Sequence, residues 1–225
     1  MAKPLRIGGL TPLSSVDYPD HLSAVLFCQG CPWRCRYCHN PHLLPAHGRG
    51  EIEWRDALDF LERRRGLLDA VVFSGGEPTL HPGLADAMLA VKQMGFRVGL
   101  HTAGIYPRRL QSVLSLVDWI GLDVKAPFAA YESVTGRCDS GAAAYASLRL
   151  VLASGVDHEI RTTVDPALLP APALRALIGE IAASGVRRCV LQECRGGICA
   201  SSCYLDAGFL AALSGHFDSL SVRRA

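Results

Sequence analysis

Short apolar segments alternate with amphipathic segments along most of this chain, and that alternation limits the folds open to it. Runs of β-branched and aromatic residues that predict strands lie at 24–27, 70–73, 96–100, 117–124, 158–164 and 189–191. Apolar residues spaced i, i+3, i+4 and i+7 predict helices at 54–61, 84–91 and 174–181. A glycine follows each of these helical segments, as is common at helix ends.

Alternating strands and helices predict an α/β fold, in which right-handed βαβ units build a parallel sheet with the helices outside. Six repeats predict an open, partial (β/α)6 TIM-like barrel, because a closed eight-unit barrel takes about 250 residues and this chain has 225. We expect a single domain over residues 1–225, with a core at about 20–195 and a C-terminal extension at 196–225. Its ligand site should lie at the carboxyl ends of the strands.

Charge and cysteine content exclude several classes of function. The chain has 23 basic and 21 acidic residues in no long block, so we expect neither nucleic acid nor a membrane as partner. Met1–Arg6 lack the apolar core of a secretory signal, and no long apolar stretch follows, so we expect a cytoplasmic protein. Nine cysteines, an odd number, fit reduced metal ligands better than a full set of disulfides.

Three cysteines, Cys31, Cys35 and Cys38, directly follow the first predicted strand. Three thiolates can hold three irons of a four-iron, four-sulfur cluster and leave the fourth iron open to bind a small molecule. A zinc site is the alternative, because the spacing of Cys35 and Cys38 is also common in zinc sites.

Gly75-Gly76-Glu77-Pro78 follows the second predicted strand. Two glycines allow a ligand to approach the backbone closely, and a carboxylate beside them can accept hydrogen bonds from an ammonium group. The same tetrapeptide could instead form a tight turn in which Pro78 begins a helix.

Charged residues occur at the ends of the later predicted strands. Asp123 and Lys125 alternate and therefore share one face, either as a salt bridge at the mouth of the barrel or as ligand contacts. Arg161 lies within an apolar strand, where a guanidinium is costly unless it meets an anion. Because parallel strands end at one edge, we expect these residues and the cysteines to converge there.

The cysteine spacing Cys-x3-Cys-x-aromatic-Cys and the Gly-Gly-Glu-Pro turn resemble the motifs of the radical S-adenosylmethionine (radical SAM) superfamily. Almost end to end, the chain resembles the activating enzymes of glycyl radical proteins, most closely the longer form of the anaerobic ribonucleoside-triphosphate reductase activating proteins. The segments that carry this resemblance are Ile7–Leu10, Val16–Pro19, Gln29–Cys31, Tyr37–Pro41, Val72–Thr79, Leu122–Pro127 and Arg161–Thr163. Ala103 departs from the pattern, since relatives often have asparagine there.

The resemblance implies a partial barrel of the radical SAM type that binds two cofactors, a 4Fe-4S cluster and S-adenosyl-L-methionine. Cys31, Cys35 and Cys38 would hold the cluster. The residues expected to contact S-adenosylmethionine are Tyr37, His39, Gly75, Gly76, Glu77, Thr102, Asp123, Lys125 and Arg161. No residue is expected to act as a general acid or base, because a 5′-deoxyadenosyl radical does the chemistry.

The implied partner is a glycyl radical enzyme, the anaerobic ribonucleotide reductase, which would lose a Cα hydrogen from one glycine. Asp17 corresponds to an acidic residue that relatives place near the partner's glycyl loop. A flavodoxin or ferredoxin would donate the electron. The alternatives are another glycyl radical enzyme as partner, or a small molecule as in a 7-carboxy-7-deazaguanine synthase-like reaction.

Four late cysteines, Cys189, Cys194, Cys199 and Cys203, lie outside the resemblance. They could hold a second metal, either an auxiliary cluster or a zinc ion. They could equally be unrelated thiols, because Cys189 falls within a predicted strand and buried cysteines are common.

Overall fold

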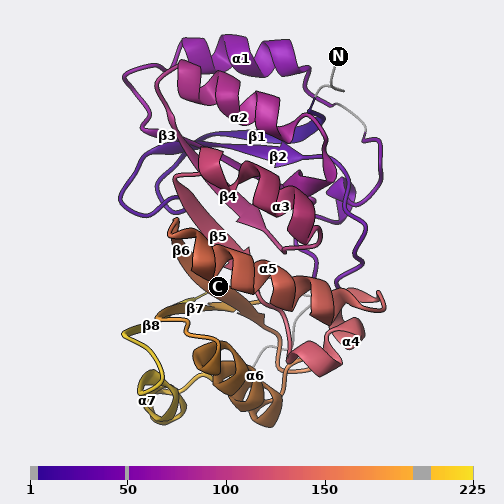
Figure 1. Ribbon diagram of the computed structural model, residues 1–225, viewed down its shortest axis with the longest axis vertical. Coiled ribbons are helices and arrows are strands. Elements are labelled where there is room, and N and C mark those ends of the chain that lie inside the picture. The colour runs from indigo at the N-terminus through magenta and orange to yellow at the C-terminus, as the bar shows by residue number, and fades with distance from the viewer. Residues whose placement is uncertain (1–4, 49–50, 195–203, 225) are drawn as a thin grey trace.

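The computed structural model describes residues 5–48, 51–194 and 204–224 of the chain. Within them, eight strands form one sheet in which each strand is hydrogen-bonded to its neighbour in sequence (Figure 1). The strands are β1 Ile7–Ser14, β2 Ser23–Cys28, β3 Ala70–Gly75, β4 Arg97–Thr102, β5 Trp119–Asp123, β6 Asp157–Val164, β7 Arg188–Glu193 and β8 Ser219–Arg223. β2 to β8 run parallel, and β1 runs antiparallel to β2.

The predicted parallel sheet is confirmed, since each of the six predicted strands corresponds to one strand from β2 to β7. Two further strands extend the sheet. β1 contains Gly8, Gly9 and Pro12, which weaken the sequence signal of a strand but are tolerated at a sheet edge. β8 lies in the segment that we expected to be an extension, and it pairs with β7.

Helices cover one face of the sheet, and Figure 1 shows α1, α2, α3 and α5 side by side across it. The helices are α1 Trp54–Glu62, α2 Leu84–Gln93, α3 Pro107–Val113, α4 Glu132–Thr135, α5 Ser140–Ser154, α6 Ala171–Ala183 and α7 Ala207–Ser214. Short 3-10 turns lie at η1 Pro41–Leu43, η2 Pro78–Leu80, η3 Leu114–Leu116 and η4 Phe128–Ala130. No described helix combines the length and apolar character needed to cross a membrane.

The sheet is buried on both faces near its centre. In β2 and β3, Leu26 and Phe73 belong to the main core cluster that includes the helices, whereas Val25 and Val72 belong to a separate cluster. Tyr18, from the loop between β1 and β2, completes that second cluster on the inner face of the barrel. Because successive residues of a strand point to opposite faces, strands with both faces covered read as continuous apolar runs.

Candidate radical SAM site

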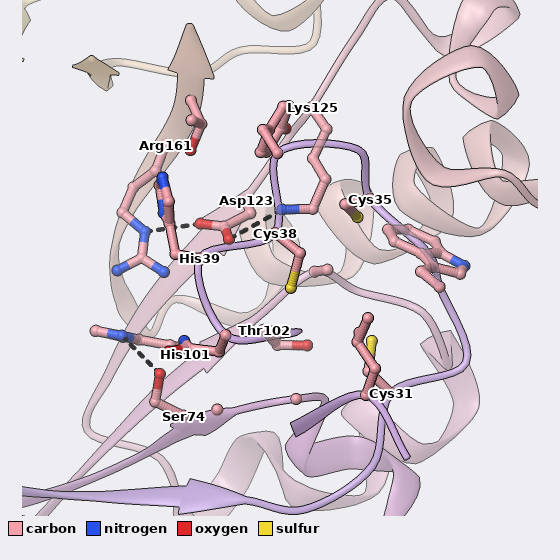
Figure 2. A pocket seen from close by; sticks show the side chains of 18 of the residues that line it. Cys31, Cys35, Cys38, His39, Ser74, His101, Thr102, Asp123, Lys125 and Arg161 are labelled. Carbon is pink, nitrogen blue, oxygen red and sulfur yellow. Dashed lines mark hydrogen bonds and ion pairs between the residues drawn. The ribbon is translucent and has the colours of Figure 1, made fainter. Parts of the chain in front are cut away.

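A cavity of about 180 Å³ lies at the carboxyl ends of the parallel strands. Figure 2 shows side chains from the loop after β2 and from the ends of β3, β4, β5 and β6 pointing into it. Of the site residues expected from the sequence, the lining includes Cys31, Cys35, Tyr37, Cys38, His39, Gly75, Gly76, Thr102, Asp123, Lys125 and Arg161. The expected convergence at one edge of the sheet is therefore present.

Other lining residues were not expected to be site residues. They are Trp33, Asn40, Leu44, Ser74, His101, Ala103, Thr163 and Gln192. Trp33 lies inside the cysteine loop, and Gln192 lies one residue beyond the predicted strand 189–191. The rule that strand ends line the site would have identified Gln192 once that strand was placed.

The cysteine loop is held in place by backbone hydrogen bonds to α4. The Arg34 amide donates to Thr135 O at 2.9 Å, and the Arg36 amide donates to Val134 O at 3.2 Å. Within the loop, the Cys38 amide donates to Cys35 O at 3.0 Å. The three cysteines therefore sit on a loop whose shape does not depend on the sulfur atoms alone.

The three thiols fit an iron-sulfur cluster better than a single zinc ion. Cys31, Cys35 and Cys38 are free thiols, and Figure 2 shows their sulfur atoms spread around one part of the cavity. Among the described residues, no three ligating side chains converge on a single ion. Burial raises the pKa of Cys31 to about 12, so a bound metal would have to displace its proton.

Gly75 and Gly76 join the turn after β3 to the cysteine loop. A Cβ on Gly75 would lie 2.4 Å from Cys28 N, and one on Gly76 would lie 2.3 Å from Gly30 O. Gly75 also has a φ of +107°, which other residues rarely adopt. The amides of Gly76 and Glu77 donate to Cys28 O and Gly30 O, each at 2.9 Å, so the glycine turn is bonded to the segment that leads into the cysteine motif.

Glu77 is the expected site residue that does not line the cavity. Its side chain is fully buried, and burial raises its pKa. Oε1 accepts hydrogen bonds from Thr79 N, Thr79 Oγ1 and Thr102 Oγ1 at 3.0, 2.6 and 2.7 Å, and Oε2 accepts one from Ala103 N at 3.1 Å. In this structure the carboxylate ties the end of β4 to the turn after β3.

Asp123, Lys125 and Arg161 form a charged cluster at the cavity, in which Lys125 and Arg161 are buried and Asp123 is partly exposed. Arg161 Nε lies 2.9 Å from Asp123 Oδ1, and Lys125 Nζ lies 3.2 Å from Asp123 Oδ2, as Figure 2 shows. Burial alone would raise the pKa of Asp123, but the charges of Arg161 and Lys125 outweigh it and lower that pKa. With all three groups ionised, the cluster carries one net positive charge toward the cavity, which suits an anionic ligand.

Gly121 makes room for the guanidinium of this cluster. It lies on β5 opposite Glu159 of β6, and a Cβ there would lie 2.7 Å from Arg161 Cζ. Arg161 NH2 also donates to Gly121 O at 3.4 Å. The position of Arg161 is thus fixed by the neighbouring strand β5 as well as by the carboxylate of Asp123.

Tyr37, in the cysteine loop, has a hydroxyl group without a hydrogen-bond partner among the described residues. Tyr37 is 4% exposed, and its hydroxyl is buried with no hydrogen bond among the described residues. Lys125 Nζ lies 5.7 Å from the centre of its ring. A buried hydroxyl at a cavity wall is an observation that favours a polar ligand there.

A broader cleft of about 820 Å³ adjoins the first cavity and contains Asp17. Six residues line both spaces: His39, Asn40, Ser74, His101, Arg161 and Gln192. The cleft is completed by Val16, Asp17, Phe27, Glu193 and Arg223. Val16 is 69% exposed, so the edge of this cleft presents an apolar side chain to solvent.

The suggestion of a second metal at the late cysteines finds no support. Cys189 is buried within β7, where burial raises the pKa of its thiol to about 12. Cys194 lies five positions further on, with Sγ 3.8 Å from His39 Nε2. Cys199 and Cys203 lie outside the described residues.

Comparison with known proteins identifies the family of the chain. Residues 25–170 match the family described as the Radical SAM superfamily. The pyruvate formate-lyase-activating enzyme of Clostridium pasteurianum is 32% identical over 169 residues, which cover 72% of this chain and 70% of that protein. A Methanocaldococcus jannaschii protein described as a glycyl-radical enzyme activating enzyme is 37% identical over 134 residues, which cover 56% of this chain and 52% of that protein.

A solved structure shares the fold at low sequence identity. Streptococcus suis SuiB bound to S-adenosylmethionine superposes with a TM-score of 0.64 at 13% identity, covering 88% of this chain and 48% of that chain.

The chain belongs to the radical SAM superfamily, and it shares its fold with the solved structure of SuiB. Within that superfamily, its relatives place it among the glycyl-radical-enzyme activating enzymes. The chain spans 52% of the Methanocaldococcus relative and 70% of the Clostridium relative.

Proposed function

We propose that this protein generates a glycyl radical on an anaerobic ribonucleoside-triphosphate reductase. The observation that carries the proposal is the meeting of the cysteine loop, the Gly75-Gly76 turn and the Asp123–Lys125–Arg161 cluster at one cavity. Family membership supports the class of reaction. The choice of reductase rests on the resemblance of the motif segments.

The described residues suit two cofactors. When bound, a 4Fe-4S cluster and S-adenosylmethionine would supply reductive cleavage of the sulfonium and removal of a hydrogen atom from the partner. Cys31, Cys35 and Cys38 would hold the cluster. Arg161 and Lys125 would bind the carboxylate of S-adenosylmethionine, since their cluster carries net positive charge.

Further residues would orient the cofactor. The Gly75-Gly76 backbone lines the cavity without side chains and would bind the amino group. Tyr37 would pack near the adenine, with His39 and Thr102 as further contacts on the lining. Trp33 and Leu44 add apolar walls that would exclude water from the reacting atoms.

The adjoining cleft suits a peptide as the second substrate. The cleft, of about 820 Å³, adjoins the cofactor cavity, and a glycine-bearing loop would enter there. Asp17 lines it and would face that loop. The relatives, described as activating enzymes of glycyl radical enzymes, support a protein partner over a small-molecule reaction.

Electron paramagnetic resonance tests the proposal. Anaerobically reconstituted protein, S-adenosylmethionine and a flavodoxin or ferredoxin as donor would be incubated with the reductase. We expect a glycyl doublet that is absent for Cys35→Ala. A parallel incubation with pyruvate formate-lyase tests the second candidate, which is favoured by the named activity of the Clostridium relative. A doublet only on the lyase would overturn the choice of reductase.

A further inference from the structure

The loop between β1 and β2, residues 15–22, is attached to the inner face of β4 at two consecutive residues. His101 Nε2 lies 2.8 Å from Asp17 O. The next residue, Tyr18, packs over Gly99, where a Cβ would lie 3.2 Å from Tyr18 Cδ1. Gly99 and His101 alternate on β4 and so share a face of the sheet. One strand therefore holds both the backbone and the next side chain of this loop.

The hydrogen bonds of His101 determine which of its two ring nitrogens carries the proton. Asp17 O can only accept, so Nε2 carries the proton and donates to it. Nδ1 then accepts from Ser74 Oγ at 3.3 Å, as the dashed line in Figure 2 marks. The ring is 9% exposed. Burial, and then the charge of Arg161, lower the pKa of His101 well below its usual range, which agrees with a neutral imidazole.

Aromatic packing fixes the plane of the imidazole and the position of the loop. Trp119 of β5 packs edge-on against His101, with ring centres 5.5 Å apart. Tyr18 stacks on the same Trp119 at 5.3 Å and 28°. Tyr18 and Trp119 are 5% and 2% exposed, so this packing is inside the barrel and not on its surface.

The carboxylate of Asp17 is aimed by a second contact. Ser14 Oγ donates to Asp17 Oδ2 at 2.5 Å and lies 3.3 Å from the Asp17 amide, which donates to it. The side chain of Asp17 remains 33% exposed and lines the broader cleft. His101 Nε2 thus fixes the backbone of Asp17 and Ser14 holds Oδ2, while Oδ1 lies 3.9 Å from His101 Nδ1. The acid faces the space where the partner would enter.

The geometry points to His101 as a positioning residue that holds Asp17 at the cleft for the partner's glycine-bearing loop. This inference rests on the proposed function. His101 acts on Asp17 through the backbone carbonyl, so its effect should appear in recognition of the partner protein more than in cleavage of S-adenosylmethionine. It assigns to His101 a task that the cysteine and glycine motifs do not perform.

Amide hydrogen exchange in the protein without cofactors tests the attachment directly. His101→Leu removes the donor, and we expect residues 15–21 to exchange at least about tenfold faster. His101→Gln keeps an N–H that can reach Asp17 O, and we expect most of the protection to return. His158→Leu is the matched control, because within the described part of the chain that ring bonds only the Val156 carbonyl two residues away. Unchanged exchange in His101→Leu would overturn the inference.

Kinetics test the consequence for the partner. We expect His101→Leu to raise the KM for the reductase about tenfold or more. Because His101 also lines the cofactor cavity, partner-independent cleavage of S-adenosylmethionine is compared in Ser14→Ala, which changes a residue outside that lining and should lower the cleavage much less than it changes the KM. Ser14→Ala, a smaller change that should fold readily, is expected to shift the same KM in the same direction. Equal losses in both assays would contradict a positioning role.

Different results would refute the proposed function and the positioning role of His101. If the wild-type protein yields no glycyl signal on any partner, the proposed function fails while the exchange result still stands. If the signal forms and the KM is unchanged in His101→Leu, the positioning role fails alone.

Discussion

Gly76 lies where the turn after β3 meets the cysteine loop, and its neighbour there is backbone, which cannot rotate away. We predict that Gly76→Ala destabilises the protein by about 2 kcal/mol, because overpacking against a fixed group costs ~1–3 kcal/mol. The Cβ would lie 2.3 Å from Gly30 O, so the cysteine loop should also shift. Urea unfolding and iron content after anaerobic reconstitution measure the two effects.

Gly179 provides the matched control for that substitution. It lies within α6, and a Cβ there would meet nothing within 4 Å. Gly179→Ala should therefore be neutral or stabilise by up to about 1 kcal/mol, since alanine favours a helix over glycine. Equal losses of stability in the two variants would mean that the clash with Gly30 O does not cause the destabilisation of Gly76→Ala.

Acid should weaken the fold through His101. Its pKa in the folded state is lowered below 6.5, so the unfolded chain takes up a proton that the folded protein does not. Stability is therefore fully present above pH 6.5 and falls as the pH drops below it, by at most about 1.4 kcal/mol per pH unit.

We predict that His101→Gln reduces this dependence on pH. The free energy of unfolding, measured with urea at pH 7.5, 6.5 and 5.5, should decline less steeply than in the wild type. Part of the decline should remain, because burial also lowers the pKa of His81. Parallel declines in the two proteins would show that His101 is not responsible.

At the scale of elements, the strands buried on both faces could be predicted and the edge strands could not. β3 reads Ala-Val-Val-Phe, an unbroken apolar run, because helices cover one side and the inner cluster covers the other. β8 reads Ser-Leu-Ser-Val-Arg, and five residues of alternating polarity give too weak a pattern. α5 was missed because apolar residues and alanines surround much of it, which leaves no single stripe.

The candidate site was predictable to the extent that its residues follow predicted strands. The cysteines, the glycine turn and the charged cluster each come directly after a strand, so parallel pairing brings them together. The internal bonds of Glu77 were not predictable, because Thr102 and Ala103 are distant in sequence and reach it only through the sheet. The attachment of Asp17 to His101 depends in the same way on tertiary packing.

Packing between β4 and the helices should carry much of the stability. Leu100 is fully buried in β4, and we predict that Leu100→Ala lowers the free energy of unfolding by about 3 kcal/mol, through lost contacts and the cavity left behind. Leu89→Ala, in α2 at 43% exposure, should cost less than about 1 kcal/mol. Similar losses in the two variants would contradict the assignment of the core to this face of the sheet.

At the scale of the whole molecule, helices cover one face of the sheet, as Figure 1 shows. The candidate site lies at the carboxyl ends of the strands. The partial barrel stays open, so the same edge can hold cofactors in a cavity and present a cleft beside it. Tyr18 and Trp119 fill the inner face below that edge. The cofactor cavity and the cleft for the partner share six lining residues, and the loop after β1 lines only the cleft.

The hydrogen bonds and packing of the cysteine loop predict that the fold survives without iron. The cysteine loop is bonded to α4 through the Arg34 and Arg36 amides, and the main core is built by strands and helices. A zinc finger unfolds without its metal. In contrast, the apoprotein should retain the circular dichroism spectrum of the folded protein and unfold in urea in one cooperative transition. Chelation should speed hydrogen exchange mainly at residues 31–40. Loss of the cooperative transition on removing iron would mean that the cluster holds the barrel together and is not simply carried by it.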